Sequence, residues 1–303
     1  MNPKFCFNLK DNSVVDSPVQ LVYVDGPFLL LHSEAVEADE SEQQSFEFEH
    51  EIKLVKQFSI STPSASSSPK KTLLFVLVLL ENNHLVILQA TGDQQQNLQL
   101  NLVKTVNFNE LLSTKNNSSS IIQIRQCPRN PNQLYLLTSN SSLLFIDNFI
   151  ILTRLSDSLL KDRLAAGQLI KEFSFKPSGT ISDFIVLKDS NEVLTVGRDQ
   201  MITWWNFEES SSKPTSSIFA IFSTKNNAEP ENHTLQQHLM KPVKTLNEPD
   251  RHLDRIVATY QSLVLAEDTK NGRLLIFDSE LGIILKVLKG YRDCSGYFLQ
   301  DGS

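Results

Sequence analysis

Histidine and cysteine are the residue types through which this chain could bind a metal or attack a substrate. The six histidines lie in unrelated segments, and none shows the His-Glu-x-x-His spacing that binds zinc. Cys6, Cys127 and Cys294 form neither a zinc pair nor a disulfide framework, which is typical of a reducing compartment. The chain contains no Gly-x-Ser-x-Gly motif and no Gly-rich phosphate loop. The sequence therefore predicts a non-enzyme with no catalytic centre, metal or cofactor.

A cluster of polar residues, KGYRD, follows the apolar run of residues 274–288. Asp293 could pair with Arg292 or Lys289, and Tyr291 could fill the space after a turn at Gly290. A strand that ends in solvent also gathers polar residues and a Gly turn, so these residues alone are equally typical of an ordinary strand end.

Composition and charge exclude several classes of protein. With 40% hydrophobic and 21% charged residues, the chain can bury a core. The net charge of −7, without a basic stripe, argues against nucleic-acid binding. No apolar segment is long enough to span a bilayer, and the first residues lack a signal-peptide core. We expect a cytoplasmic protein that reaches membranes only peripherally, through partners.

Short apolar segments predict the elements that would position any functional residues. The predicted strands lie at residues 46–58, 72–80, 85–90, 99–108, 134–138, 142–147, 184–187, 192–197, 201–207, 255–260, 262–269, 272–278 and 282–288. Those at 72–90 and 134–147 flank the short polar stretches ENNH and SNSS, so each pair predicts a hairpin. Regularly spaced short strands indicate an all-β sandwich, barrel or propeller.

One segment breaks this pattern. Leucines at helical spacing, followed by Gly167, predict a helix over residues 152–167. Such a helix is either a packed insertion in the β framework, which we favour, or a partner-binding helix. Polar stretches rich in Ser, Asn, Pro or acidic residues predict disordered insertions in a single domain spanning residues 1–303. These insertions lie near residues 34–45, 59–71, 113–120, 208–217 and 223–241.

The order of strands and turns favours one β framework. Residues 192–207, EVLTVGRDQMITWWNF, give a strand, a Gly-Arg-Asp turn and a strand with tandem Trp, as in a blade of a WD-type propeller. Residues 268–290 repeat the order, and a blade needs about 40 residues. The sequence thus predicts a WD-like β-propeller of about four or five blades, which would be incomplete. A sandwich, which would suit a carbohydrate or ligand binder, would bury the same strands.

Residues 247–293 resemble the N-terminal domain of the non-catalytic, regulatory subunit of the Rab-three GTPase-activating complex. The matching positions are Asp268, Gly272, Arg273, Asp278, Gly282, Lys289, Gly290, Tyr291, Arg292 and Asp293. Residues 134–167 and 171–187 are similar to upstream blocks of the family. Cys294 and the residues after it depart from the family's Ala and Gly-Trp, and family members are several times longer. We therefore expect a fragment or a short form.

The resemblance implies a regulatory subunit that binds a catalytic subunit and supports its action on Rab GTPases in membrane traffic. It further implies exchange activity of the assembled complex toward Rab-eighteen at the endoplasmic reticulum. The alternative is a generic propeller scaffold of a coat, tether or ciliary assembly without a GTPase role. In both cases the mechanism is positioning rather than bond making.

Two sets of residues have competing interpretations. Because GTPase-activating proteins insert an Arg finger into the active site, Arg292 or Arg273 is a possible finger. The resemblance is to the subunit without the catalytic role, so we favour a structural role for both. Trp204 and Trp205 point to opposite faces of a strand. Either one is core and the other a possible interface residue, or both are buried.

Overall fold

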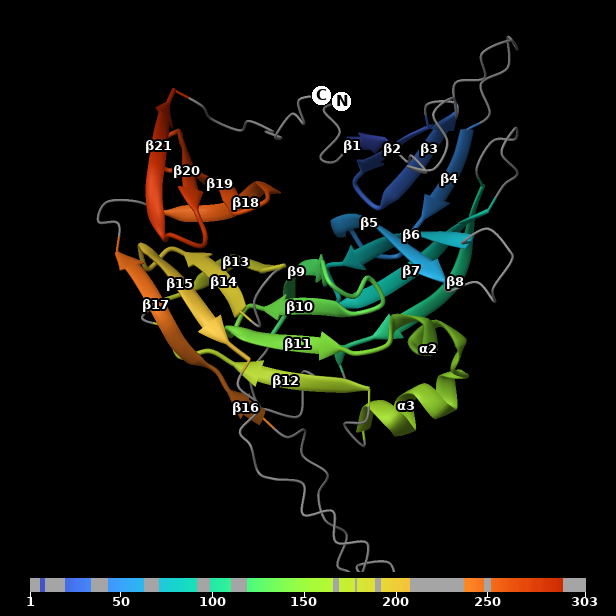
Figure 1. Ribbon diagram of the computed structural model, residues 1–303. Helices are drawn as coiled ribbons and strands as arrows, with labels where there is room; N and C mark the ends of the chain where they lie inside the picture. The colour runs from blue at the N-terminus through green and yellow to red at the C-terminus, as the bar shows by residue number, and fades with distance from the viewer. Residues whose placement is uncertain are drawn as a thin grey trace, which may run out of the picture. The chain divides into compact units, whose positions relative to one another are not determined.

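The computed structural model describes eleven stretches of the chain. Most of the described residues lie in strands (Figure 1). The described residues are 6–8, 20–33, 43–62, 71–91, 99–109, 119–165, 169–177, 179–188, 192–207, 237–247 and 252–290. The chain divides into two compact units, one containing residues 1–120, 130–132 and 149–155, the other the rest. Each unit has its own sheets and core, and the single domain spanning residues 1–303 stays a prediction.

The first unit contains two four-stranded antiparallel sheets. One consists of β1 (Cys6–Asn8), β2 (Gln20–Asp25), β3 (Phe28–Ser33) and β4 (Gln43–Glu47), the other of β5 (Ile52–Thr62), β6 (Lys71–Leu80), β7 (His84–Thr91) and β8 (Gln99–Asn107). Val22 and Leu29 of the first sheet share a buried core with Val76 and Val78 of the second. Helix α2 (Phe149–Arg154) also belongs to this unit, and Phe149 packs edge to face on Phe75, with ring centroids 5.2 Å apart.

The second unit contains three sheets and helix α3 (Asp157–Ala165). In chain order the sheets consist of β9 (Ile121–Gln126), β10 (Leu134–Thr138), β11 (Ser142–Ile146) and β12 (Ile170–Ser174); β13 (Ile181–Val186), β14 (Glu192–Gly197), β15 (Met201–Asn206) and β17 (Lys241–Asn247); and β18 (Leu253–Tyr260), β19 (Leu263–Asp268), β20 (Arg273–Asp278) and β21 (Ile283–Lys289). Neighbouring strands are antiparallel, except that the short β16 (Gln237–Leu239) lies parallel to β12.

The middle sheet of the second unit is buried on both faces. Val193 and Trp205 share one core with the β9–β12 sheet, and Leu194 and Trp204 share another with the β18–β21 sheet. Strand β14 is consequently buried along its whole length except for the half-buried Glu192 at its start, as expected of a strand covered on both sides. In a two-sheet sandwich each sheet keeps one outer face. Three sheets stacked face to face are therefore incompatible with the sandwich alternative and match the blades of a propeller.

Most of the predicted strands and both predicted hairpins are present, and the strands of residues 255–288 form one antiparallel sheet. The strand predicted over residues 46–58 is wrong, because the chain leaves one sheet after Glu47 and enters the next at Ile52. Between them Phe48 N donates to Pro27 O at 3.1 Å, and Ile52 N donates to Gly26 O at 3.3 Å. Alternating polarity continues across this corner, so the pattern alone does not reveal it.

The helical insertion predicted over residues 152–167 is present but is broken into two short helices. The chain leaves the helical path at Leu155, whose carbonyl accepts a hydrogen bond from Lys104 Nζ at 3.0 Å. Ser156 then precedes α3, where a Ser is a favoured N-cap residue. Leu159, one of the leucines at helical spacing, is half exposed because α3 starts a new helical register. Gly167 lies outside the described residues.

The predicted disordered insertions lie largely outside the described residues. The parts that the structure describes include residues 43–45 in β4, 59–62 in β5 and 237–241 in β16 and β17. Strand β17 was not predicted from the sequence. It completes the middle sheet by pairing with β15, with Met201 opposite Asn247.

Candidate functional site

The first group of family-pattern residues forms the turn between β19 and β20. The buried Asp268 accepts hydrogen bonds from Asn271 N at 3.1 Å and Asn271 Nδ2 at 2.8 Å. Gly272 has a φ of +59°, which a residue with a side chain rarely adopts, and Arg273 then begins β20 opposite Asp268. In this turn Asp268 and Gly272 have a structural role.

Asp278 organises the next turn, which joins β20 to β21. Its Oδ1 accepts hydrogen bonds from Glu280 N at 2.9 Å and Leu281 N at 2.8 Å, and its Oδ2 accepts one from Ser262 Oγ at 2.9 Å. These bonds, the one from Leu281 N above all, lower the pKa of Asp278 below its ordinary value of 3.8. The turn ends at Gly282, with a φ of +66°.

The pKa of Asp278 predicts a pH-dependent contribution to stability. Because the folded pKa is lowered, the charged carboxylate stabilises the protein above pH 3.8, and this contribution is lost as the pH falls through the folded pKa. We expect the urea midpoint of wild type to fall more steeply between pH 5 and pH 3 than that of Asp278→Asn, which stays neutral. At pH 7 the variant should be the less stable of the two. Parallel pH profiles for the two proteins would contradict this account.

Lys244 of β17 lies against this turn. Its Nζ donates to Leu281 O at 2.5 Å and lies 5.3 Å from the centroid of the Trp204 ring, within the range of a cation–π interaction. A Cβ at Gly282 would lie 2.0 Å from Lys244 Nζ. Gly282 is therefore required both for the turn and for the placement of this lysine.

A groove opens beside Lys244, between the middle sheet and the β18–β21 sheet. It has a volume of about 430 Å³ and is lined by Leu187, Lys188, Glu192, Trp204, Val243, Lys244, Gln261, Ser262, Ser279 and Glu280. We call it the Trp204 groove. Trp204 Nε1 donates to Ser279 O at 2.7 Å, so the indole bonds one sheet to the turn of the next. Asp278 and Gly282 thus form the turn that supplies one wall of the groove.

Trp204 and Trp205 are both 2% exposed, and the alternative of burial on both sides is the one that the structure shows. Trp205 packs toward the β9–β12 sheet and donates from Nε1 to Thr195 Oγ1 at 2.8 Å. Neither indole is an exposed interface residue, which corrects that interpretation. The reason is that the middle sheet has no outer face, so side chains on both faces of β15 point into a core.

The remaining residues of the family pattern lie at the other end of β21. Lys289 pairs with Arg273 in the sheet, and Gly290 N donates to Gly272 O at 3.0 Å, with a φ of +85° at Gly290. Tyr291, Arg292 and Asp293 lie outside the described residues, so the finger and pairing hypotheses for them stay predictions. Arg273 lies within a strand, half buried.

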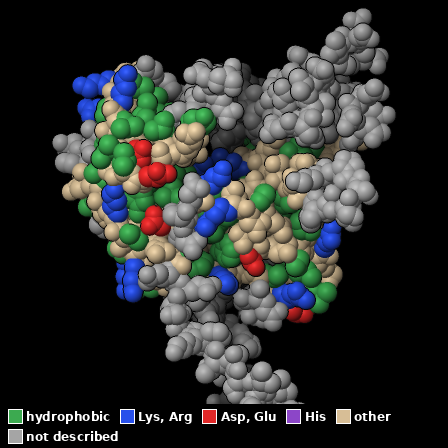
Figure 2. All heavy atoms as spheres, viewed as in Figure 1, with side chains coloured by type: hydrophobic (Ala, Val, Ile, Leu, Met, Phe, Trp, Pro, Cys, Tyr) green, Lys and Arg blue, Asp and Glu red, His purple; other side chains and the backbone are tan. Residues whose placement is uncertain are grey.

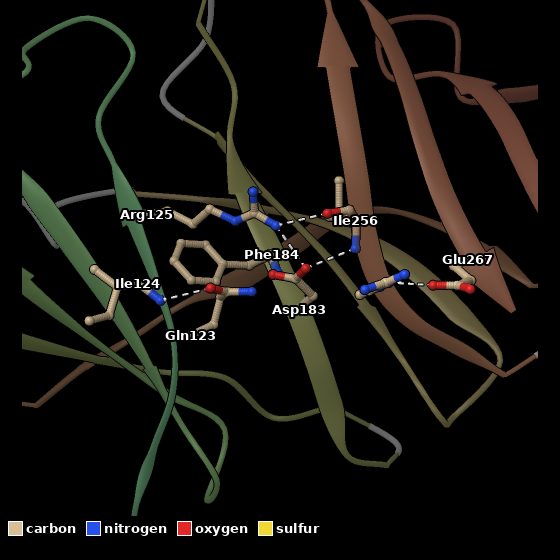
Figure 3. A network of polar contacts seen from close by, with 8 residues as sticks. Gln123, Ile124, Arg125, Asp183, Phe184, Ile256 and Glu267 are labelled. Atoms are coloured by element: carbon tan, nitrogen blue, oxygen red, sulfur yellow. Dashed lines mark hydrogen bonds and ion pairs between the residues drawn. The ribbon is translucent and has the colours of Figure 1, made fainter. Parts of the chain in front are cut away.

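A polar network links the first strands of all three sheets in the second unit (Figure 3). Asp183 of β13, 1% exposed, accepts hydrogen bonds from Arg125 Nη2 at 2.7 Å and from the main-chain N of Ile256 at 2.8 Å. Arg125 Nη2 also donates to Ile256 O at 3.1 Å. Next to Ile256 on β18, Arg255 Nε donates to the buried Glu267 of β19. These hydrogen bonds and ion pairs join the three sheets at one place.

Sequence reasoning missed this network and the lysine of the groove. Arg125 and Ile256 are 131 residues apart, and no local pattern marks Asp183 as their partner. Lys244 was missed because β17 follows a long polar stretch and carries no buried side chain, so it lacks the apolar alternation that would suggest a strand. Among the described residues, no group of three or more His, Cys, Asp or Glu could hold a metal, and no helix could cross a membrane.

No protein-family model matches the chain, and no curated protein matches it. Among similar solved structures is Sqt1 from Chaetomium thermophilum, with 12% identity and a TM-score of 0.50 over 89% of this chain and 56% of Sqt1. The fold is a WD-like β-propeller. Helices α2 and α3 are an insertion between β11 and β12.

Two further similar structures complete the comparison. The β-propeller domain of Cps50 (Swd1) from Myceliophteria thermophila has 12% identity and a TM-score of 0.49, over 92% of this chain and 71% of that domain. A chain of the polycomb repressive complex 2 from Chaetomium thermophilum has 13% identity and a TM-score of 0.49, over 92% and 53%. The chain thus spans about half the length of Sqt1 and of the polycomb chain. At these identities the likeness concerns the fold alone.

Proposed function

We propose that this propeller is a non-catalytic regulatory subunit of a Rab GTPase-activating complex, which binds the catalytic subunit and positions it on Rab GTPases. The observation that supports the proposal is the family pattern of residues 268–290, in which Asp278 and Gly282 build the turn beside an exposed lysine and a groove.

The proposed role is binding and positioning. The chain holds the catalytic subunit, works in the cytoplasm and reaches transport membranes or the endoplasmic reticulum only through its partners. Arg finger chemistry belongs to the catalytic subunit, so Arg292→Ala should leave GTP hydrolysis by the assembled complex unchanged. Because a fold does not by itself determine a function, the alternative scaffold role in a coat, tether or ciliary assembly is the competing outcome.

Reconstitution with the catalytic subunit of a Rab GTPase-activating complex tests the proposal. We expect the two proteins to co-elute on gel filtration and the pair to accelerate GTP hydrolysis by a Rab GTPase beyond the catalytic subunit alone. The control is the chain with the Rab GTPase and no catalytic subunit, which should leave the intrinsic rate unchanged. Failure of the folded chain to bind the catalytic subunit at micromolar concentration would reject the Rab role and favour the alternative scaffold.

A further inference from the structure

The Trp204 groove combines an apolar lining with an exposed apolar rim. Leu187 and Val243 line it beside Trp204, and Val243 is 57% exposed. Leu281, 63% exposed, belongs to the turn that forms one wall. Hydrophobic and charged side chains are interspersed over the surface formed by β17 and β21 (Figure 2). Exposed apolar side chains around a groove are typical of a site that buries a partner's side chain.

The charges available at the groove are mainly positive. Lys188 and Lys244 are exposed, and the Lys244 ammonium has three N–H donors, of which Leu281 O takes one. The Asp278 carboxylate already accepts three hydrogen bonds, and Glu192 is half buried with a partner. Glu280 is the exposed carboxylate of the lining. The groove therefore offers two lysines against one exposed acid.

The net charge of the whole chain does not reverse this local preference. At physiological ionic strength the screening length is about 8 Å, so carboxylates elsewhere on the surface act weakly on a ligand in the groove. The lysines within hydrogen-bonding reach of such a ligand decide which charge it carries.

Strand addition to the neighbouring edges is disfavoured. Strand β17 is the edge of its sheet among the described strands, and it carries Pro242 and pairs with β15 through a register shift. Strand β21 is likewise irregular where it pairs with β20, and it carries Lys286 and Lys289. Proline, lysine and bulges at an edge are devices that prevent another strand from pairing. A partner would therefore contact side chains in the groove.

We propose that the Trp204 groove binds an acidic segment of a protein partner that carries a bulky apolar side chain. The apolar side chain lies against Leu187 and Val243, and the flanking carboxylates pair with Lys188 and Lys244. This inference rests on the proposed function of the chain as a protein-binding subunit and adds the site and the chemistry of what it binds.

Fluorescence anisotropy with two labelled decapeptides tests the inference. One peptide has a single Phe flanked by Asp and Glu in a Gly and Ser background, and the other has Lys in place of every acidic residue. We expect the folded full chain to bind the acidic peptide at least tenfold more tightly than the basic one. Lys244→Glu should weaken binding tenfold or more, and Glu280→Gln should strengthen it a few-fold.

Lys289→Glu is the matched control, because it makes the same charge change at an exposed lysine of β21, in the neighbouring sheet, at the end of that strand far from the Asp278–Gly282 turn. We expect it to change binding less than twofold. Trp204 supplies a second readout: the acidic peptide should shift its indole N–H resonance and leave that of Trp205, which faces the opposite core, in place. Equal binding of the two peptides, or no loss with Lys244→Glu, would overturn the inference.

Two comparisons separate this inference from the proposed function. If the catalytic subunit binds Lys244→Glu and wild type equally well, the groove inference is wrong and the Rab role stands. If the acidic peptide binds through Lys244 and the catalytic subunit does not bind, the groove inference stands and the Rab role is wrong. Vesicles containing phosphatidylserine test a membrane as the ligand of the groove. If wild type binds these vesicles, Lys244→Glu does not, and the acidic peptide does not bind at all, the ligand is a membrane and the inference is rejected.

Discussion

Asp183→Ala is expected to destabilise the second unit by about 3 kcal/mol or more, because removing one partner of a buried ion pair leaves the other charge uncompensated. The substitution strands the Arg125 guanidinium, whose Nε has no partner even in wild type, and removes the acceptor of Ile256 N. It also removes the acceptor of Phe184 N, which donates to Asp183 Oδ1 at 2.8 Å. Each unsatisfied buried donor adds about 1–3 kcal/mol to the loss.

Tryptophan fluorescence in urea measures this loss cleanly. The chain has two Trp residues, and both lie in β15 of the second unit, so their emission reports on that unit. A loss of about 3 kcal/mol shifts the midpoint by about 1 M urea or more, given a slope of about 2–3 kcal/mol/M.

A surface ion pair provides the matched control for Asp183. Arg198 Nε lies 3.2 Å from Asp254 Oδ1, but the Arg198 side chain is 71% exposed. Arg198→Ala should cost under about 1 kcal/mol, because water replaces the lost contact of this exposed side chain. If Asp183→Ala and Arg198→Ala shift the midpoint equally, the network does not join the three sheets as argued.

Trp204→Ala is expected to cost about 3–5 kcal/mol, as is usual for truncating a large buried aromatic side chain. The indole fills the core between the middle sheet and the β18–β21 sheet, and its N–H satisfies Ser279 O. The loss should appear in the urea midpoint of the second unit, with Trp205 as the remaining probe. An exposed interface residue would instead lose binding and leave the midpoint unchanged.

Two variants calibrate this result. Trp204→Phe keeps most of the apolar volume and loses the hydrogen bond to Ser279 O, so it should cost clearly less than Trp204→Ala. Leu285→Ala removes a half-exposed side chain from the same unit and should change stability by about 0.5 kcal/mol or less. A midpoint for Trp204→Ala within the range of Leu285→Ala would contradict burial of this indole.

The sequence by itself determined the strand composition, both early hairpins and the last blade. These features depend on neighbours within about ten residues: alternating or continuous apolar runs, and turns that need Gly272 or Gly282 at positive φ. The tandem Trp also followed from local pattern, since side chains on a strand alternate between its two faces. The local sequence did not determine whether both faces of β15 are covered by other sheets.

Only the tertiary structure decided that question and the location of the candidate site. The middle sheet buries both faces because sheets distant in sequence stack on each side of it, which periodicity within β15 does not encode. The first strands of the three sheets lie close together, and this brings Arg125, Asp183 and Ile256 into contact. Lys244 lies against Gly282 because β17 joins its sheet after a long intervening segment. Such contacts depend on which sheets become neighbours. The local sequence does not specify these neighbours, because the burial of apolar faces is non-directional.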